Sequence, residues 1–287
     1  MDAEERARRF AAEAATESRA LPRVQKDVLA EIVKQLGIAQ RLVIAQLSAK
    51  PSEAAQRRLR QLQREVENAM EDFRQAALTA STQGAGTAWA GGIRSISAPF
   101  DAAGVALTGL RIDAGALMAS KRLLTDRITD ISARALDKLN GTLMQHIIGA
   151  VPLSDTITRV QTILGGAPRS RAMTVAYTEI GRDYSIAQDA SLQQAGSIVP
   201  DLRKRWLKSG KLHPRVSHVQ ANNQIVRYDQ PYLVDGEKLM FPRDPNGSAG
   251  NTINCGCHSI PVVDGSSFGA STIRFTDSGQ LRKVVEQ

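Results

Sequence analysis

Two cysteines lie one residue apart near the C-terminal end of the chain, and their side chains have the most evident chemistry. Cys255 and Cys257 occur in the stretch NTINCGCHS, and the chain has no other cysteine. A disulfide between residues this close would close a strained ring, so the thiols are either metal ligands or small buried groups. His213, His218 and His258 lie nearby in the sequence. Two cysteines with two histidines form a common zinc-binding set.

Packing and metal binding remain alternatives for this pair. Structural zinc sites ordinarily space their cysteines as CxxC rather than CxC, so we favour a structural corner held by hydrogen bonds and packing, with a disulfide last. The alternative is a structural zinc, for which the candidate ligands are His218, Cys255, Cys257 and His258. A catalytic zinc is disfavoured, because HExxH and HxE…PCxxC patterns are absent. No other cofactor is indicated.

The basic segment LRKRWLKSGKLHPR is a second candidate site. Its cations could contact phosphates while Trp206 stacks on a base, although a solvated face with Trp206 as an anchor is the favoured interpretation. The candidate phosphate contacts are Arg203, Lys204, Arg205 and Lys208. Arg215 and His218 could form an acid–base pair, but no recognisable nucleophile accompanies them. We therefore expect no enzyme.

Apolar residues that recur every three or four positions predict the helices that must carry these groups. The predicted ranges are 24–47, 59–77, 128–147, 154–164 and 173–191. The first two form a hairpin with a coiled-coil-like second helix, joined at SAKPSEA, where Pro51 and Glu53 suit a first helical turn. The stretch Gly84–Gly92 is expected to interrupt the helices as a hinge, because glycine is costly inside a helix.

The segment after Pro200 changes to a pattern typical of strands. IVRYDQPYLV alternates apolar and polar residues, DGEK is typical of a hairpin turn, KLMF continues the alternation, and CHSIPVV is a last short strand. The predicted class is α+β and mostly helical, with an N-terminal helical hairpin and helices followed by a small C-terminal β-rich lobe. We divide the chain into a hairpin (1–83), a hinge and connecting segment (84–121), a helix-and-lobe module (122–265) and a tail (266–287).

Composition limits the classes of protein that fit. Aromatic residues make up only 4% of the 287 residues, so the core must be largely aliphatic. An excess of 37 Lys and Arg over 29 Asp and Glu gives a formal charge of +8, which makes proximity to nucleic acid plausible. We find no secretory signal and no apolar stretch long enough to cross a bilayer. We expect a soluble protein made in a reducing cytoplasm, without a membrane partner.

The order and spacing of several short elements in the C-terminal half resemble the phage Mu F-like head morphogenesis family, also called minor head or minor capsid proteins. The elements that carry the resemblance are Arg171, then Thr178 and Glu179 in AYTEI, Trp206, Arg215 and His218 in RVSH, the RYDQPYLVDGEKLMFPRDP hairpin and loop, and Asn254, Cys255 and Cys257 in NCGC. Two departures are that Tyr177 and Gly256 stand where the family tends to have arginine. A third is that the histidine that often precedes the Asn-Cys element is absent.

The resemblance implies a structural protein of the phage virion, made in the host cytoplasm and placed inside the capsid at the portal vertex. Its partners would be the portal protein, the major capsid or scaffolding protein, and packaged double-stranded DNA bound without sequence preference. It would act in head morphogenesis and in DNA packaging or delivery. Family members are sometimes fused to toxin domains, and we expect none here because the chain ends soon after the lobe. The alternatives are a metal-dependent nuclease or deaminase, and a nucleic-acid-binding assembly factor that stays outside the virion.

A polar network is the role that we expect for the motif residues. Thr178 and Glu179 lie on the predicted helix 173–191, and we expect them to hydrogen-bond into the lobe. The lobe residues concerned are Arg215, His218, Asn254 and Cys255. A satisfied network of this kind would lock a loop-rich lobe without any catalytic step.

Overall fold

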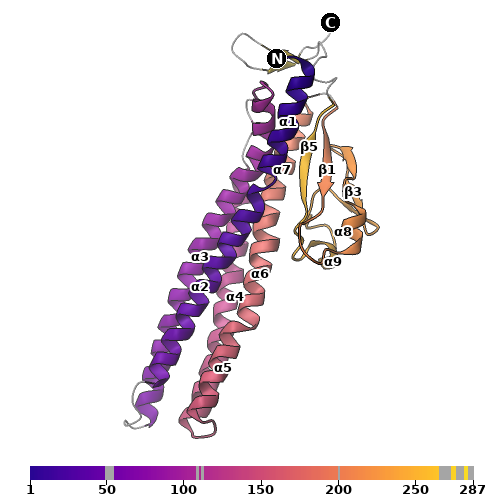
Figure 1. The fold of residues 1–287 in the computed structure, drawn as a ribbon. Helices are drawn as coiled ribbons and strands as arrows, with labels where there is room; N and C mark the ends of the chain where they lie inside the picture. Colours follow the sequence, from indigo (N-terminus) through magenta and orange to yellow (C-terminus); the bar gives the residue numbers. More distant parts are fainter. Residues whose placement is uncertain are drawn as a thin grey trace. The chain divides into compact units, whose positions relative to one another are not determined.

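The computed structural model of the chain describes residues 1–48, 55–107, 110, 113–199, 201–264, 273–275 and 281–283. Helices predominate in this part of the chain and the strands follow residue 202, so the predicted mostly helical α+β class is confirmed (Figure 1). The elements are α1 (Ala3–Glu17), α2 (Ala20–Ser48), α3 (Ala55–Ala102), α4 (Ala114–Ile147), α5 (Leu153–Gly165), α6 (Ala167–Thr174), a π-helix (Val175–Ile180), α7 (Gly181–Gly196), β1 (Arg203–Leu207), α8 (Val216–Gln220), β2 (Ile225–Arg227), β3 (Tyr232–Val234), β4 (Glu237–Leu239), α9 (Ala249–Thr252), β5 (His258–Val262), β6 (Ile273–Phe275) and β7 (Leu281–Lys283).

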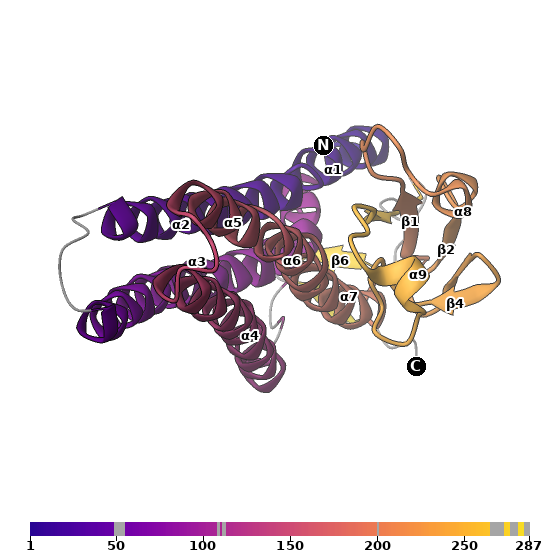
Figure 2. The same cartoon turned by 90° about the horizontal axis from the view of Figure 1, so that it is seen from below.

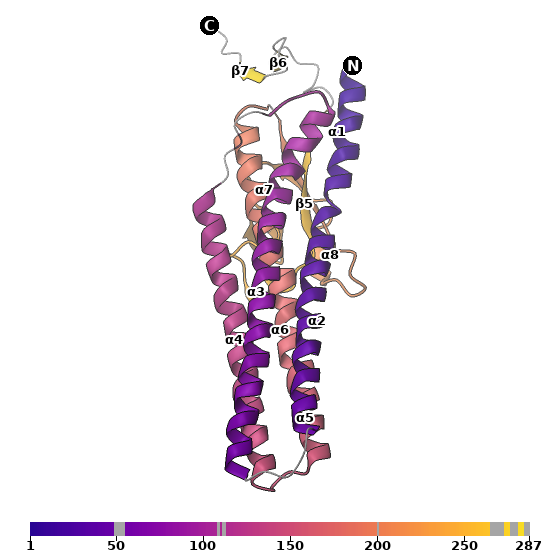
Figure 3. The same ribbon diagram turned by 90° about the vertical axis from the view of Figure 1, so that its left-hand side faces the viewer.

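The chain divides into two compact units, and the second of them, residues 26–84 and 119–176, is helical. Within this unit α2, α3, α4 and α5 lie side by side (Figures 2 and 3). Ser132 of α4 donates a hydrogen bond to the carbonyl of Met70 in α3 at 3.0 Å. Gln40 of α2 donates to the carbonyl of Gln161 in α5 at 3.2 Å. The buried aliphatic residues include Ile32, Leu36, Val43, Leu62, Val66, Leu124, Ile128 and Leu139, so the interior is aliphatic as the composition requires.

The predicted helical hairpin corresponds to α2 and the beginning of α3, and both of its helices are confirmed. Its connection, residues 49–54, lies outside the described residues, as do Pro51 and Glu53. The predicted helices 128–147 and 154–164 fall within α4 and α5. α5 begins at Leu153, one residue before the predicted start, and Pro152 precedes it as the N-cap, where proline's fixed φ suits the entry to a helix.

The glycine-rich stretch Gly84–Gly92 is helical, and the predicted hinge in this stretch is wrong. α3 continues from Ala55 to Ala102 without interruption. A Cβ atom at Gly92 would lie 2.3 Å from the carbonyl oxygen of Tyr184 and 2.8 Å from the Cβ of Ala187, both in α7. Glycine therefore allows α3 and α7 to approach closely. The packing gained at this contact offsets the backbone entropy that glycine loses in a helix.

The first unit, residues 1–25, 85–118 and 177–287, joins helices to the β-rich lobe. Phe10 of α1 packs edge to face against Phe100 of α3, with ring centroids 4.9 Å apart, and Leu192 of α7 belongs to the same apolar cluster. The sequence pattern does not predict α1, because charged residues and alanine dominate its stretch. Its N-cap is a local signal, since Asp2 accepts a hydrogen bond from the backbone N–H of Glu5 at 2.8 Å.

The lobe contains a three-stranded antiparallel sheet in the order β2-β1-β5 and a separate β3–β4 hairpin. Asp235 and Gly236 connect the hairpin with φ angles of 52° and 75°, which are the positive values of a two-residue type I′ turn. The predicted turn and its return strand are confirmed, but the first run splits into β2, which pairs with β1, and β3. The strand predicted in CHSIPVV is β5, but it is not the last, because β6 and β7 follow and pair with each other. The pattern misses β1, because its residues RKRWL have the composition of a solvated basic segment. No helix in the described part of the chain is long and apolar enough to span a bilayer.

Candidate functional site

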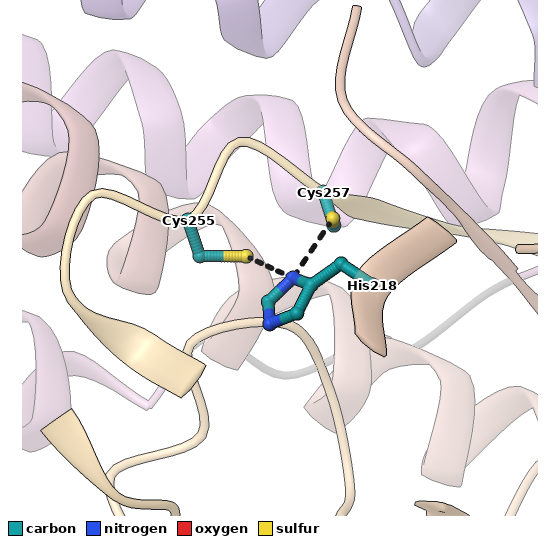
Figure 4. Close-up of side chains that lie close together, drawn as sticks. All are labelled: His218, Cys255 and Cys257. Atoms are coloured by element: carbon teal, nitrogen blue, oxygen red, sulfur yellow. Dashed lines mark hydrogen bonds between the residues drawn. The ribbon is translucent and has the colours of Figure 1, made fainter. Parts of the chain in front are cut away.

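His218, Cys255 and Cys257, which we call the His–Cys–Cys cluster, meet in the interior of the first unit. His218 comes from α8, and the two cysteines flank Gly256 in the turn between α9 and β5. The Nδ1 atom of His218 lies 3.3 Å from the Sγ atom of Cys257 and 3.6 Å from that of Cys255 (Figure 4). All three ligand atoms lie within 4.8 Å of one another, and all three residues are buried. Both thiols are free, so the cluster is a potential metal-binding set.

The imidazole of His218 is oriented by a hydrogen bond on its far side. Its Nε2 atom lies 3.3 Å from the Oδ1 atom of Asn251. The amide group of Asn251 is itself oriented, because its Nδ2 donates to the carbonyl of Val234 at 3.4 Å. Nε2 therefore faces the amide oxygen of Asn251, and Nδ1 faces the two sulfurs. A ligand histidine commonly has such a partner for its second nitrogen.

Arg243 holds the backbone of the cysteine turn. Its guanidinium is fully buried, and its Nη1 donates to the carbonyls of Cys255 at 2.8 Å and Cys257 at 2.9 Å. Its Nη2 donates to the hydroxyl of Ser185 in α7 at 2.8 Å. The turn is thus tied to a helix by a charged donor, the stronger kind of hydrogen bond.

The two thiols differ in acidity because they share a hydrogen bond. That hydrogen bond from Cys257, the contact with His218 and the charge of Arg243 lower the pKa of Cys255 well below that of an ordinary thiol, against the opposing effect of burial. The same hydrogen bond and burial raise the pKa of Cys257. A thiolate is the form that binds a metal, and the hydrogen bond between the thiols favours the loss of one proton from the pair.

A cavity of about 230 Å³ opens beside the cluster and is lined by all three of its residues. Its other wall is the loop between β1 and α8, which contributes Lys211, His213 and Arg215. Lys211 donates to the carbonyl of Asn254. Arg215 donates to the carbonyl of Ile253 at 2.6 Å. The loop is therefore fastened to the chain just before the cysteine turn.

Thr178 and Glu179, the helix residues of the predicted polar network, are connected to the lobe in two different ways. Thr178 accepts a hydrogen bond directly from the backbone N–H of Asn254 at 2.8 Å. Glu179 pairs with Arg182 at 2.6 Å. Arg182 in turn donates to the carbonyl of Arg243 at 3.1 Å. The structure therefore connects Thr178 directly, and Glu179 through an arginine.

Arg171 does not take part in this network. It belongs to the second unit, where it pairs with Asp130 of α4 at 2.9 Å. Trp206, by contrast, lies in the core of the lobe. Its ring meets the ring of His218 edge to face with centroids 5.8 Å apart, and it contacts Tyr232 in the same way at 5.2 Å. Trp206 is fully buried, so it acts as the anchor that we favoured rather than as a stacking platform.

The structure does not bring His258 into the cluster, and this corrects its prediction as a candidate zinc ligand. It is the first residue of β5 and directly follows Cys257. Its imidazole is not among the potential ligand atoms that lie within 4.8 Å of one another around the two sulfurs. Burial, followed by the charge of Arg243, lowers the pKa of His258 to about 4.

The candidate phosphate contacts on β1 alternate between buried and more exposed side chains. Lys204 is buried, its ammonium lies 3.3 Å from the Asp189 carboxylate, and it donates to the carbonyl of Met240 at 2.7 Å. Its role as a phosphate contact is therefore wrong, because a strand turns alternate side chains inward. Arg203 and Lys208 are exposed, and Arg205 is half-buried.

Two residues central to the site, Arg243 and Asn251, are not among those that the sequence predicts. Arg243 lies in the stretch FPRDPNG, where an arginine ordinarily faces solvent, and its positive φ of 69° has no local signal. Asn251 lies four residues before Cys255. Its proximity to the CxC element was the only available indication that it belongs to the site.

The fold and the site define a mostly helical α+β protein that carries a buried His–Cys–Cys cluster able to hold a metal ion.

The chain is similar to curated proteins over part of its length. It is 33% identical over 132 residues to the uncharacterized protein YqbB of Bacillus subtilis, a match that covers 44% of this chain and 42% of YqbB. It is 31% identical over 101 residues to the NAD(+)–arginine ADP-ribosyltransferase EFV of Enterococcus faecalis, covering 35% of this chain and 20% of that protein. The chain thus spans less than half of either relative. No family model and no solved structure matches it.

Proposed function

We propose that this protein is a phage minor head protein, a non-enzymatic component placed at the portal vertex inside the capsid that acts in head morphogenesis. The observation that carries the proposal is that motif residues and Arg243 make their hydrogen bonds to the protein's own backbone. Thr178 and Arg215 bond to the backbone around the cysteine turn, and Arg243 bonds to the carbonyls of the cysteines themselves. Side chains that already hydrogen-bond the protein's own backbone stabilise the fold. This arrangement supports a folded assembly module rather than a substrate site.

The same proposal names the partners. The helices of the second unit offer surfaces for the portal protein and for the major capsid or scaffolding protein, since amphipathic helices commonly pair with partner helices. The formal charge of +8 lowers the cost of lying near packaged double-stranded DNA. This contact would have no sequence preference and would assist DNA packaging or delivery.

The ADP-ribosyltransferase relative is compatible with this proposal. Its match to the chain covers only 20% of that protein, and the family that the motifs resemble includes fusions to toxin domains. We propose that the shared part is the head module, with the transferase activity carried elsewhere in that relative.

Quantitative mass spectrometry of purified phage particles tests the proposal, with the portal protein as the internal standard. We expect a few copies of this chain for each portal ring, before triggered DNA release. A fall in copy number after release would add a role in delivery. Absence from washed particles would overturn the virion placement and leave an assembly factor outside the virion, or a metal-dependent nuclease or deaminase. DNA cleavage or base conversion lost in His218→Ala would identify the enzyme.

We further propose that the metal held by the His–Cys–Cys cluster is a structural zinc ion. A tetrahedral ion with zinc–nitrogen and zinc–sulfur bonds of about 2.0 and 2.3 Å places its nitrogen and sulfur ligands about 3.5 Å apart. The His218 contacts of 3.3 Å and 3.6 Å have this length. Two thiolates and an imidazole also suit zinc better than harder cations. The ion would join α8 to the turn before β5.

Zinc content of the purified full chain tests this part of the proposal. We expect about one zinc per chain, and a loss of stoichiometric zinc in Cys257→Ser. Replacing His258, which lies outside the cluster, by alanine is the matched control and should leave the content unchanged. A wild-type chain that takes up no zinc would overturn the zinc site without affecting the virion proposal.

A further inference from the structure

The His–Cys–Cys cluster supplies three ligands, whereas a structural zinc ion ordinarily takes four protein ligands. The fourth must come from a residue that can reach the same cavity. His258 is excluded, because its imidazole is not among the ligand atoms that lie within 4.8 Å of one another in the described part of the chain. The inference below rests on the zinc ion of the proposed function.

His213 is the remaining histidine at the cavity. It lies in the loop between β1 and α8 and lines the same cavity of about 230 Å³ as His218 and the two cysteines. Four residues separate His213 from His218, a spacing within the range of three to five that is usual between paired zinc-binding histidines. Its exposed side chain is not committed to the core, so it can turn inward when an ion is present.

The loop that carries His213 is held on both sides. Lys211 donates to the carbonyl of Asn254 and Arg215 donates to that of Ile253. Lys211 also places its ammonium 4.8 Å from the centre of the Tyr177 ring. Leu212, His213 and Pro214 are the residues between these anchors, which limits how far the imidazole must travel.

Gly256 explains why the loop can lie so close to the cysteine turn. A Cβ atom at Gly256 would lie 2.8 Å from the Cβ of Ser209 and 3.1 Å from the Cε of Lys211. A long side chain between the two cysteines would push this loop away. The glycine therefore lets the loop approach the cysteines, although arginine is usual at this position in the family that the motifs resemble.

We propose that His213 is the fourth zinc ligand and completes a site of two histidines and two cysteines. Two thiolates and two neutral imidazoles would neutralise the ion, an arrangement compatible with the cations of Lys211, Arg215 and Arg243 nearby. The competing protein ligand is the Oδ1 atom of Asn254, which is buried and has no hydrogen-bond partner among the residues that the structure describes. Imidazole suits a zinc–thiolate site better than an amide oxygen does.

X-ray absorption at the zinc edge of the zinc-loaded full chain tests the assignment. We expect two sulfur and two imidazole ligands in the wild type, and one imidazole fewer in His213→Ala. Zinc affinity should fall by about 100-fold or more in that variant, since even loss of a ligand's hydrogen-bond partner costs about 10–100-fold. His213→Cys should restore four protein ligands with a third sulfur, and His258→Ala should match the wild type.

The possible failures are distinct. A wild-type ion with one imidazole and an oxygen or chloride in the fourth position would overturn the assignment of His213 but leave the zinc site intact. An unchanged spectrum and affinity in His213→Ala would do the same. A full chain that binds no zinc would overturn both the zinc site and this inference. Because His213 is exposed, its replacement should leave the melting temperature of the metal-free protein unchanged, which separates ligand loss from misfolding.

Discussion

Arg243 is the residue on which the cysteine turn most depends. Its buried guanidinium satisfies two backbone carbonyls of the turn and a serine hydroxyl of α7. A charged group in such a place is costly to bury, so its hydrogen bonds must offset that cost. The absence of a side chain at Gly181 leaves room for the guanidinium, because a Cβ atom there would lie 2.7 Å from the Nε atom of Arg243.

We expect Arg243→Met to lower the free energy of unfolding by at least about 3 kcal/mol. The replacement leaves buried acceptors without a donor, each at a cost of about 1–3 kcal/mol. Urea denaturation followed by tryptophan fluorescence measures the change. Arg203→Met is the matched control, because Arg203 is exposed on β1 and should change stability by no more than about 0.5 kcal/mol. Equal losses in the two variants would contradict the role given to Arg243.

The contact between α3 and α7 shows how an element is shaped by its neighbour. Gly92 lies against the backbone of α7. A Cβ atom added at Gly91 would lie 3.4 Å from the ring of Tyr184. A Cβ atom at Gly86 of the same helix would meet no described residue within 4 Å. The same residue type therefore has opposite roles at positions six residues apart.

Gly92→Ala and Gly86→Ala should change stability in opposite directions. We expect Gly92→Ala to destabilise the protein by about 1–3 kcal/mol, the usual cost of overpacking. Gly86→Ala should stabilise it by about 1 kcal/mol, because alanine has the higher helix propensity and the site has room. Thermal unfolding of both variants tests this. Destabilisation by Gly86→Ala would restore the case for a flexible segment there.

At the scale of the whole molecule, the two compact units can be followed by different probes. Both tryptophans, Trp89 and Trp206, belong to the first unit, and Trp206 contacts His218 of the His–Cys–Cys cluster. Fluorescence therefore reports the unit that carries the candidate zinc site. Far-UV circular dichroism reports the helices of both units.

We expect zinc to raise the unfolding midpoint detected by tryptophan fluorescence, and a chelator to reverse the rise. A ligand that binds only the folded state at 100 times its Kd adds about 2.7 kcal/mol of stability. Cys257→Ser should show no response to zinc. A shift of the same size in that variant would mean that zinc binds elsewhere on the chain.

Local sequence determined much of the secondary structure. The helices α2, α4 and α5 follow from apolar spacing of three to four residues, and the β3–β4 hairpin follows from Asp235-Gly236 between alternating runs. These signals are carried by residues close in the chain, so they can be read without knowing the partners. The CxC element and His218 could be picked out for the same reason, from residue type.

Tertiary structure alone decided which of these residues meet. Cys255 and His218 are 37 residues apart, and only the packing of α8 against the turn before β5 chooses His218 over His258 as the neighbour of the thiols. Burial of Lys204 and Arg243, and the helical state of Gly92, also depend on segments distant in sequence. Their burial costs and packing gains arise between elements, where no pattern within a single segment can express them.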